Sequence, residues 1–210
     1  MRAQAAWQAV QIPLRAAQRG RSMAELALCG AQSLTAWRHY PRSDARDTAS
    51  GCSFYFHAHN DARSAEEHGH FHLFMRLPQA GGFQHLAALS IDNLGRPLRW
   101  FATNAWVTGE QWQPALRMRD ALPQFALQMR GPAAPVGRWL EALVRLHQDA
   151  LAELLERRDA TLGARQAATL EPLERILADR DLDLLAESPV NLGQRLQQLQ
   201  ASLDNDPGDD

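Results

Sequence analysis

The sequence predicts an α+β fold in which an antiparallel β-meander of about four strands, over residues 52–107, is flanked by N-terminal and C-terminal helices. Runs of alternating polar and apolar residues follow one another across short turns, which is typical of consecutive antiparallel strands. No helical pattern separates these runs, and this argues against the βαβ units of a parallel sheet. Apolar residues at helical spacing occur on both sides of the region.

The amino-acid composition is typical of a globular protein. The chain has 210 residues, of which 45% are hydrophobic and 22% charged, and its formal net charge is −2. These values are ordinary for a globular protein and do not suggest binding to nucleic acid or to a membrane. No apolar run is long enough to span a membrane and no secretory segment follows Met1, so we expect a cytoplasmic protein that acts on a small-molecule substrate. All 22 basic residues are arginine, which excludes Schiff-base and pyridoxal chemistry on lysine.

Three segments are expected along the chain. Residues 1–130 are predicted to form an α+β domain that carries a histidine cluster. Residues 131–204 are predicted to be a helical segment that packs on this domain and offers a surface for a homodimer. The acidic end, residues 205–210, is predicted to be a disordered tail.

The N-terminal region is predicted to be helical. A first helix, near residues 3–18, is interrupted by Pro13. A second helix begins at Ser22, because Ser22 and Glu25 have the spacing of a capping box. Its apolar positions continue at helical spacing as far as Trp37.

Two neighbouring strands carry histidines on one face. Side chains alternate between the two faces of a strand, so His57 and His59 share a face in the run at 53–59, opposite its phenylalanines. The next run, at 66–74, repeats the pattern with three histidines. A short polar segment between the runs is suited to closing an antiparallel hairpin.

Imidazoles on facing strands can converge on one metal ion. We therefore predict metal ligands among six residues of the hairpin: His57, His59, Glu66, His68, His70 and His72. Zinc or iron is the expected cofactor, because neutral imidazole suits both. Glu67 is a candidate general base, His70 a candidate catalytic residue, and Arg99 a candidate ligand for an anionic substrate.

The type of metal chemistry stays open at this point. Three histidines without a carboxylate favour zinc-dependent hydrolysis, whereas two histidines with a glutamate favour a non-haem-iron oxygenase. A non-catalytic metal carrier or a structural metal site is a further alternative. Such a protein would share the metal ligands but not the reaction.

Residues 38–50 are predicted to be a loop that leads into the first histidine strand. Asp44 and Asp47 in this loop, or Asn60 in the hairpin, could hydrogen-bond the imidazole nitrogen that faces away from the metal. Cys52 flanks the first strand and is a further possible ligand.

The run from His68 to Phe74 (HGHFHLF) resembles the histidine-triad motif, in which histidines alternate with apolar residues. The resemblance implies nucleotide hydrolysis or transfer without a metal, in which His70 attacks the α-phosphate and His68 and His72 assist. Gly69 replaces the apolar residue of that motif. The match covers seven residues, and the pair at His57 and His59 is not part of it.

Two further strands are predicted at Phe83–Ile91 and Leu98–Thr103, joined by a hairpin turn at residues 92–96. His85 joins the cluster if its strand pairs beside the first two. The next segment is rich in aromatic and polar side chains. Its residues are expected to wall a pocket and orient a ligand: Asn104, Trp106, Thr108, Glu110 and Trp112.

The C-terminal part is predicted to be helical. A Gly- and Pro-rich run at 131–135 precedes an amphipathic stripe that includes His147 as a packed residue. Two shorter helices are expected at residues 173–186 and 192–203, the second with Asn191 as its N-cap.

Overall fold

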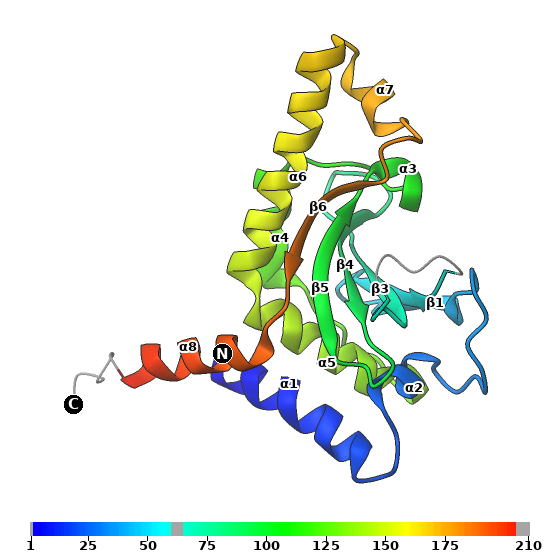
Figure 1. Cartoon of the computed structure of the whole chain (residues 1–210), viewed down its shortest axis with the longest axis vertical. Helices are drawn as coiled ribbons and strands as arrows, with labels where there is room; N and C mark the ends of the chain where they lie inside the picture. Colours follow the sequence, from blue (N-terminus) through cyan, green and yellow to red (C-terminus); the bar gives the residue numbers. More distant parts are fainter. Residues whose placement is uncertain (1, 60–64, 205–210) are drawn as a thin grey trace.

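The computed structural model describes residues 2–59 and 65–204, without the side chain of Leu203. These residues form an antiparallel six-stranded sheet whose strands follow the order of the chain (Figure 1). The strands are β1 (Tyr40–Arg46), β2 (Ser53–His57), β3 (Gly69–Met75), β4 (Gln84–Ile91), β5 (Pro97–Thr103) and β6 (Leu184–Pro189). The predicted α+β meander is therefore confirmed, with one further strand at each edge.

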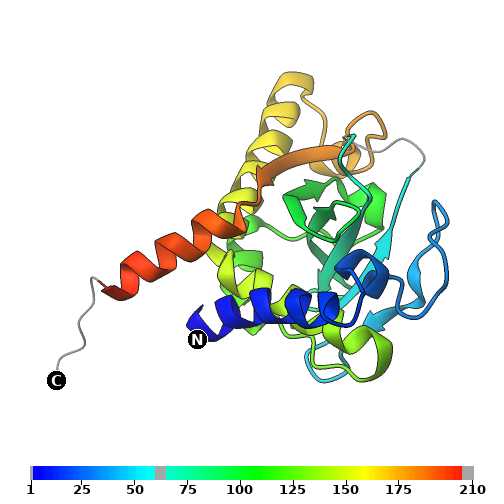
Figure 2. The same cartoon turned by 60° about the horizontal axis from the view of Figure 1, so that its bottom comes forward.

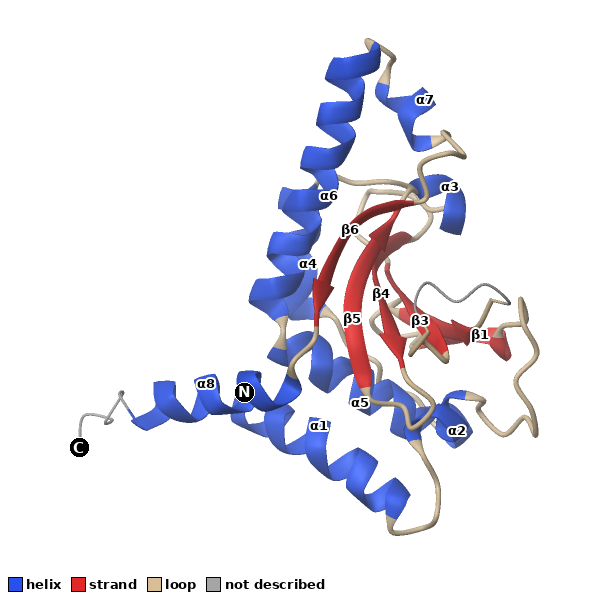
Figure 3. Ribbon diagram, in the orientation of Figure 1, coloured by secondary structure: helices blue, strands red, loops and turns tan. Residues whose placement is uncertain are grey.

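The helices differ in their relation to the sheet: most gather along one side of it, whereas α3 and α7 lie at its upper end (Figure 3). They are α1 (Arg2–Ala17), α2 (Met23–Ala27), α3 (Ala105–Thr108), α4 (Ala115–Ala121), α5 (Ala134–Leu146), α6 (Gln148–Thr169), α7 (Leu173–Leu177) and α8 (Leu192–Asp204). Short 3₁₀ turns, at Leu122–Gln124 and Gly131–Ala133, precede α5. None of the helices within 2–59 and 65–204 is both long and apolar enough to cross a membrane.

The hydrophobic core lies between the sheet and α5. Phe54 and Phe56 of β2 point to this side together with Phe71 and Leu73 of β3, and all four are fully buried. Trp139 of α5 meets the ring of Phe71 edge-on, with 6.0 Å between the ring centroids. Burial of each such side chain stabilises the fold by about 1.5–3 kcal/mol, so this face fixes the register of the two strands.

Both edge strands correct the sequence prediction. Residues 40–46, predicted to be part of a loop, form β1, in which Tyr40 and Ala45 are buried against β2. The alternation is weak because this is an edge strand, where charged residues and Pro41 are tolerated. Residues 184–189, of which the first three were predicted to be helical, form β6 and pair with β5.

The N-terminal helices differ from prediction at two points. α1 continues through Pro13 as one helix. The capping box of α2 is confirmed, since Ser22 and Glu25 bond each other's backbone N–H. However, α2 ends early because Cys29 and Gly30 adopt positive φ angles of 50° and 97°. The expected continuation to Trp37 is therefore a loop.

The C-terminal segment completes the sheet. The predicted stripe is divided into α5 and α6 at His147, which is buried and lies with Nδ1 3.0 Å from the carbonyl oxygen of Leu143. Beyond α6, the chain returns as β6 beside β5. The segment at 131–204 thus contributes a strand as well as helices. The predicted disordered tail at 205–210 lies outside the described residues.

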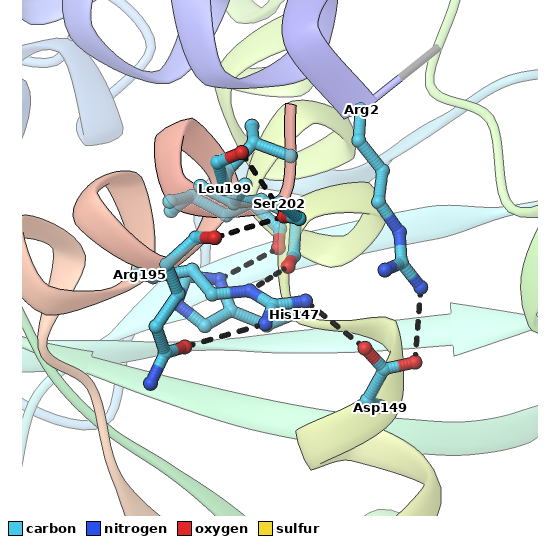
Figure 4. A network of polar contacts seen from close by, with 9 residues as sticks. Arg2, His147, Asp149, Arg195, Leu199 and Ser202 are labelled. Atoms are coloured by element: carbon cyan, nitrogen blue, oxygen red, sulfur yellow. Dashed lines mark hydrogen bonds and ion pairs between the residues drawn. The ribbon is translucent and has the colours of Figure 1, made fainter. Parts of the chain in front are cut away.

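Helices α1 and α8 are both fastened at the α5–α6 junction (Figure 4). Asp149 accepts hydrogen bonds from Arg2 of α1 and Arg195 of α8, each at 3.0 Å. Arg195 also donates through Nε to the carbonyl of Leu146 at 2.7 Å. The predicted N-cap of α8 is confirmed, because the Asn191 side chain accepts from the backbone N–H of Gln194. From this anchor α8 projects away from the sheet (Figure 2).

Asp47 fastens the β1–β2 turn to the segment before α5. Its carboxylate accepts from the backbone N–H groups of Ala49 and Gln128, at 2.9 and 2.8 Å, and its side chain is buried. Burial raises the pKa of this carboxyl, but hydrogen bonds from the N–H groups of Gln128, Ala49 and Ser50 outweigh burial and lower it. The stabilisation from Asp47 is therefore present above its unfolded pKa and is lost as the pH falls.

We expect Asp47→Ala to lower the free energy of unfolding at pH 7 by roughly 1–3 kcal/mol, because the partly buried N–H groups of Ala49, Ser50 and Gln128 lose their acceptor. Urea denaturation followed by circular dichroism measures this change. Asp44→Ala, at a half-exposed position on the same turn-forming pair of strands, is the control and should change stability by less than about 0.5 kcal/mol. Equal effects of the two substitutions would contradict this account of Asp47.

Candidate metal centre

Strand pairing brings the predicted histidines together. His57 lies directly opposite His70 in the β2–β3 pair, and Tyr55 lies opposite His72. Their side chains lie on the face opposite the core and line a cavity there. The Nε2 atoms of His57 and His70 are 2.8 Å apart, and His59, just after β2, places its Nε2 3.4 Å from that of His57.

His57, His59 and His70 form a group that could hold a metal ion. Their candidate ligand atoms all lie within 4.8 Å of one another. Two nitrogens bound tetrahedrally to zinc at 2.0–2.1 Å lie about 3.3–3.4 Å apart, so the spacing of His57 and His59 already fits. The spacing of His57 and His70 is shorter, and a small rotation of either ring would admit the ion.

Glu67 positions His70 from behind. Nδ1 of His70 lies 2.7 Å from Oε1 of Glu67, and this contact directs Nε2 toward His57. The other carboxylate oxygen accepts from Arg99 at 2.8 Å. A carboxylate bonded to the outer nitrogen of a histidine fixes its tautomer and orientation, as commonly seen behind metal ligands.

This pairing changes the roles predicted for Glu67 and Arg99. The Glu67 side chain is only 3% exposed and does not line the cavity at the histidines, so it does not stand where a general base would meet substrate. Arg99 is engaged by Glu67 and by Glu187, at 2.8 and 3.4 Å, rather than pointing into that cavity. Glu67 contacts the histidine group at His70, and Arg99 contacts Glu67.

Three predicted ligands lie outside the group. β3 begins only at Gly69, so strand alternation does not extend back to Glu66 and His68. Glu66 is exposed, and His68 lines a different hollow beside Asp92 and Asn93. His72 faces the same side as His70, but its Nδ1 lies 3.0 Å from Nε2 of His85.

A β-bulge brings His85 to the histidine face. Leu73 pairs with Ala87, whereas the next residue, Phe74, pairs with His85, so Leu86 is an additional residue in β4. Strict alternation would have placed His85 on the core side with Ala87. The extra residue reverses its direction, and His85 therefore joins His72.

Three imidazoles of this face, those of His57, His72 and His85, are held neutral. Burial lowers the pKa of His57 to about 2, with smaller contributions from His70, His59 and His39. Burial, followed by the charge of Arg158, lowers the pKa of His85 to about 3. The pKa of His72 is also well below its ordinary value, mainly because of burial. Neutral imidazole is the form that binds metals.

The histidine group opens into a cavity of about 610 Å³. Trp37 stacks on His59 with 4.1 Å between ring centroids, and His39 stacks on Tyr55 at 3.7 Å. Sequence reasoning missed Trp37 and His39 because their segment was predicted to be helix and loop. The alternation that placed His57 also places Tyr55, two residues earlier, on the same face.

The predicted pocket residues after β5 divide into two sets. Trp106 and Thr108 line the cavity as expected. Asn104 instead caps α3, Glu110 accepts the backbone N–H of His85 at 2.6 Å, and Trp112 lies under the guanidinium of Arg158. These three residues do not line the cavity, and their contacts stabilise the fold around it.

The other predicted partners of the histidines are placed as follows. Asp44 lines the cavity, with Oδ1 3.4 Å from Nδ1 of His39. Asp47 is used at the β1–β2 turn, and Cys52 is buried in the core. Asn60 lies outside the described residues. Glu67, which was not predicted for this role, is the partner of His70.

The histidine-triad resemblance is only partly matched by the geometry. His70 and His72 point into the cavity, but His68 does not line it. Gly69, the departure from the motif, has a packing reason. A Cβ at this position would lie 2.5 Å from Cζ of Phe56 and 2.7 Å from the carbonyl oxygen of His57.

Comparison with known families gives a match over most of the chain. A family model described as Domain of unknown function (DUF6969) matches residues 3–190, which include the whole sheet and the histidine group. No match was found among the curated proteins or among the solved structures.

We expect Gly69→Ala to lower the free energy of unfolding by about 1–3 kcal/mol, because the added methyl group collides with Phe56 and the backbone of His57. Gly163→Ala is the matched control. Gly163 lies in α6 with no atom within 4 Å of an added Cβ, so alanine should stabilise the helix by roughly 0.5–1 kcal/mol. Thermal and urea unfolding measure both, and a neutral or stabilising Gly69→Ala would contradict the close packing.

A pH dependence of stability is expected from Glu110. Burial raises its pKa from 4.5 to about 7, although Arg158 and the N–H of His85 oppose the shift. The folded state therefore holds a proton that the unfolded chain has released, and stability falls as the pH rises from 4.5 through 7. The loss is on the order of 1–3 kcal/mol.

Glu110→Gln retains an oxygen acceptor for His85 but cannot ionise. Its free energy of unfolding should fall less than that of the wild type between pH 5 and pH 8. Urea titrations across this range measure the difference, and Glu153→Gln, at an exposed position in α6, should leave the wild-type slope unchanged. Parallel profiles for wild type and Glu110→Gln would show that this carboxyl does not titrate as described.

Proposed function

We propose that this chain, which belongs to the DUF6969 family, is a metal-dependent enzyme whose ion is held by His57, His59 and His70. The observation that supports the proposal is the convergence of three imidazoles, of which that of His57 is held neutral by burial, at the wall of a cavity large enough for a small molecule. Cavities of 300–1,000 Å³ are typical of small-molecule sites. A structural metal site would instead be closed by a fourth protein ligand.

Zinc is the metal that this donor set favours. Among the described residues the group contains three imidazoles and no carboxylate oxygen, and the nearest glutamate, Glu67, is engaged by His70 and Arg99. Two histidines and one carboxylate, the set typical of non-haem iron, are not brought together there. A zinc ion with three histidine ligands lowers the pKa of a bound water toward 7 and polarises carbonyl oxygens, which suits hydrolysis.

The protein's own residues have separate tasks in this proposal. Glu67 holds the tautomer of His70, and Arg99 balances the charge of Glu67. Trp37 covers the outer side of His59. The aromatic side chains of the cavity exclude water from the rest of the substrate, which strengthens polar interactions at the ion.

Metal content and zinc titration test the proposal. We expect about one zinc ion per chain by elemental analysis of untagged protein, and loss of this binding by isothermal titration calorimetry in His59→Ala and His70→Ala. Glu67→Gln should weaken zinc binding by about 10–100-fold. His68→Ala is the matched control, since His68 lies in the same segment but outside the group, and it should bind as wild type does.

Circular dichroism would establish that each variant is folded. Protein that binds no stoichiometric zinc, or a His68→Ala variant as impaired as His70→Ala, would overturn the proposed site. Full zinc occupancy without hydrolysis of any ester, amide or phosphoester in a broad panel would instead indicate the metal carrier and count against an enzyme.

A further inference from the structure

The cavity extends well beyond the three histidines. Facing pairs on β2 and β3 line its floor in succession, from His57 and His70, through Tyr55 and His72, to Ser53 and Phe74. Neighbours on one face of a strand are about 6.6 Å apart, so the floor runs for about 13 Å from the histidine group to Phe74. The site is therefore a trough with two distinguishable ends.

The end remote from the histidines is apolar and aromatic. Phe83 meets the ring of Phe74 edge-on, with 5.3 Å between centroids, and Trp106 and Val107 of α3 also line this end. Phe83, Trp106 and Val107 are only partly buried, so they present apolar surface to the cavity. Exposed apolar surface inside a concave site is typical of a ligand-binding surface.

Charged groups near the remote end do not favour an ion there. Arg46, opposite Ser53 in the β1–β2 pair, and Asp183 both line the cavity and carry opposite charges. Asp44, farther along β1, lies beside His39. A neutral group therefore suits this end better than a charged one.

We infer that the substrate is an elongated arylalkyl compound, with an oxygen-bearing head at His57, His59 and His70 and a neutral aromatic tail against Phe74, Phe83 and Trp106. This inference rests on the proposed function for the head and on the aromatic end of the trough for the tail. A cavity of about 610 Å³ has room for such a molecule. The separation of the two ends sets the length of the linker between head and tail.

Hydroxamates of increasing length test the inference, because they share one metal-binding head and differ only in the tail. Zinc-loaded protein is titrated with acetohydroxamate, phenylacetohydroxamate and phenylhexanohydroxamate by calorimetry. We expect phenylhexanohydroxamate to bind most tightly, since only its ring reaches Phe83. Hexanohydroxamate, with the same chain but no ring, should bind more weakly than phenylhexanohydroxamate.

Phe83→Ala removes part of the remote wall without touching the histidines. It should weaken phenylhexanohydroxamate by about tenfold and leave zinc stoichiometry and acetohydroxamate binding unchanged. Trp7→Ala is the matched control, because Trp7 is an aromatic residue exposed on α1 and does not line the cavity. It should alter none of these affinities.

Zinc binding and the affinity for the aromatic tail are measured separately. Failure of the proposed metal site can therefore be distinguished from failure of the inferred substrate. Normal zinc binding with equal affinity for all four hydroxamates, or with no effect of Phe83→Ala on the longest one, would overturn the arylalkyl substrate and leave the metal site standing. Absence of zinc binding would overturn the proposed function, and the inference would fail with it because the head would have no anchor.

Discussion

The direct pairing of His57 with His70 across β2 and β3 is the constraint on which the candidate site depends. The same register buries Phe56 and Phe71 on the other face of the two strands. A slip of one residue would turn the imidazoles into the core and the phenylalanines into the cavity. The packing of the core and the convergence of the histidines are therefore two results of one register, and the apolar face supplies the energy that holds the polar face in place.

This polar face is costly to build, and the structure limits the cost in two ways. His57 and His72 are neutral, because burial and the proximity of neighbouring histidines disfavour their protonation. The buried carboxylate behind His70, that of Glu67, is matched by the guanidinium of Arg99. A buried group of imidazoles with a balanced ion pair behind it is suited to accept a cation, since an ion entering the site replaces contacts between the rings.

The sequence was informative wherever a repeating pattern had one dominant cause. Strand alternation placed His57 and His70 on a shared face, and the capping box located the start of α2. Prediction from the sequence failed where local geometry interrupts the repeating pattern. Alternation extended through His68 although β3 begins at Gly69, and the bulge at Leu86 could not be anticipated because an extra residue leaves no signature in composition.

Long-range pairing was the other limit. Glu67 meets Arg99 over 32 residues of separation, and β6 pairs with β5 after the whole helical segment. The residues of β1 resemble a loop because an edge strand needs few apolar side chains. Trp37 and His39 line the cavity from the segment just before β1. The sequence prediction missed β1, and it therefore also missed these two residues of the cavity wall.

The late return of β6 has a consequence for how the protein matures. During synthesis β5 emerges with its outer edge open, and the partner for that edge follows only after α6 and α7 have left the ribosome. The nascent chain thus has a period in which an unpaired strand is available to other chains, a known route to misassembly. The match to the family ends at residue 190, one residue beyond β6, so the matched region ends where this edge is sealed.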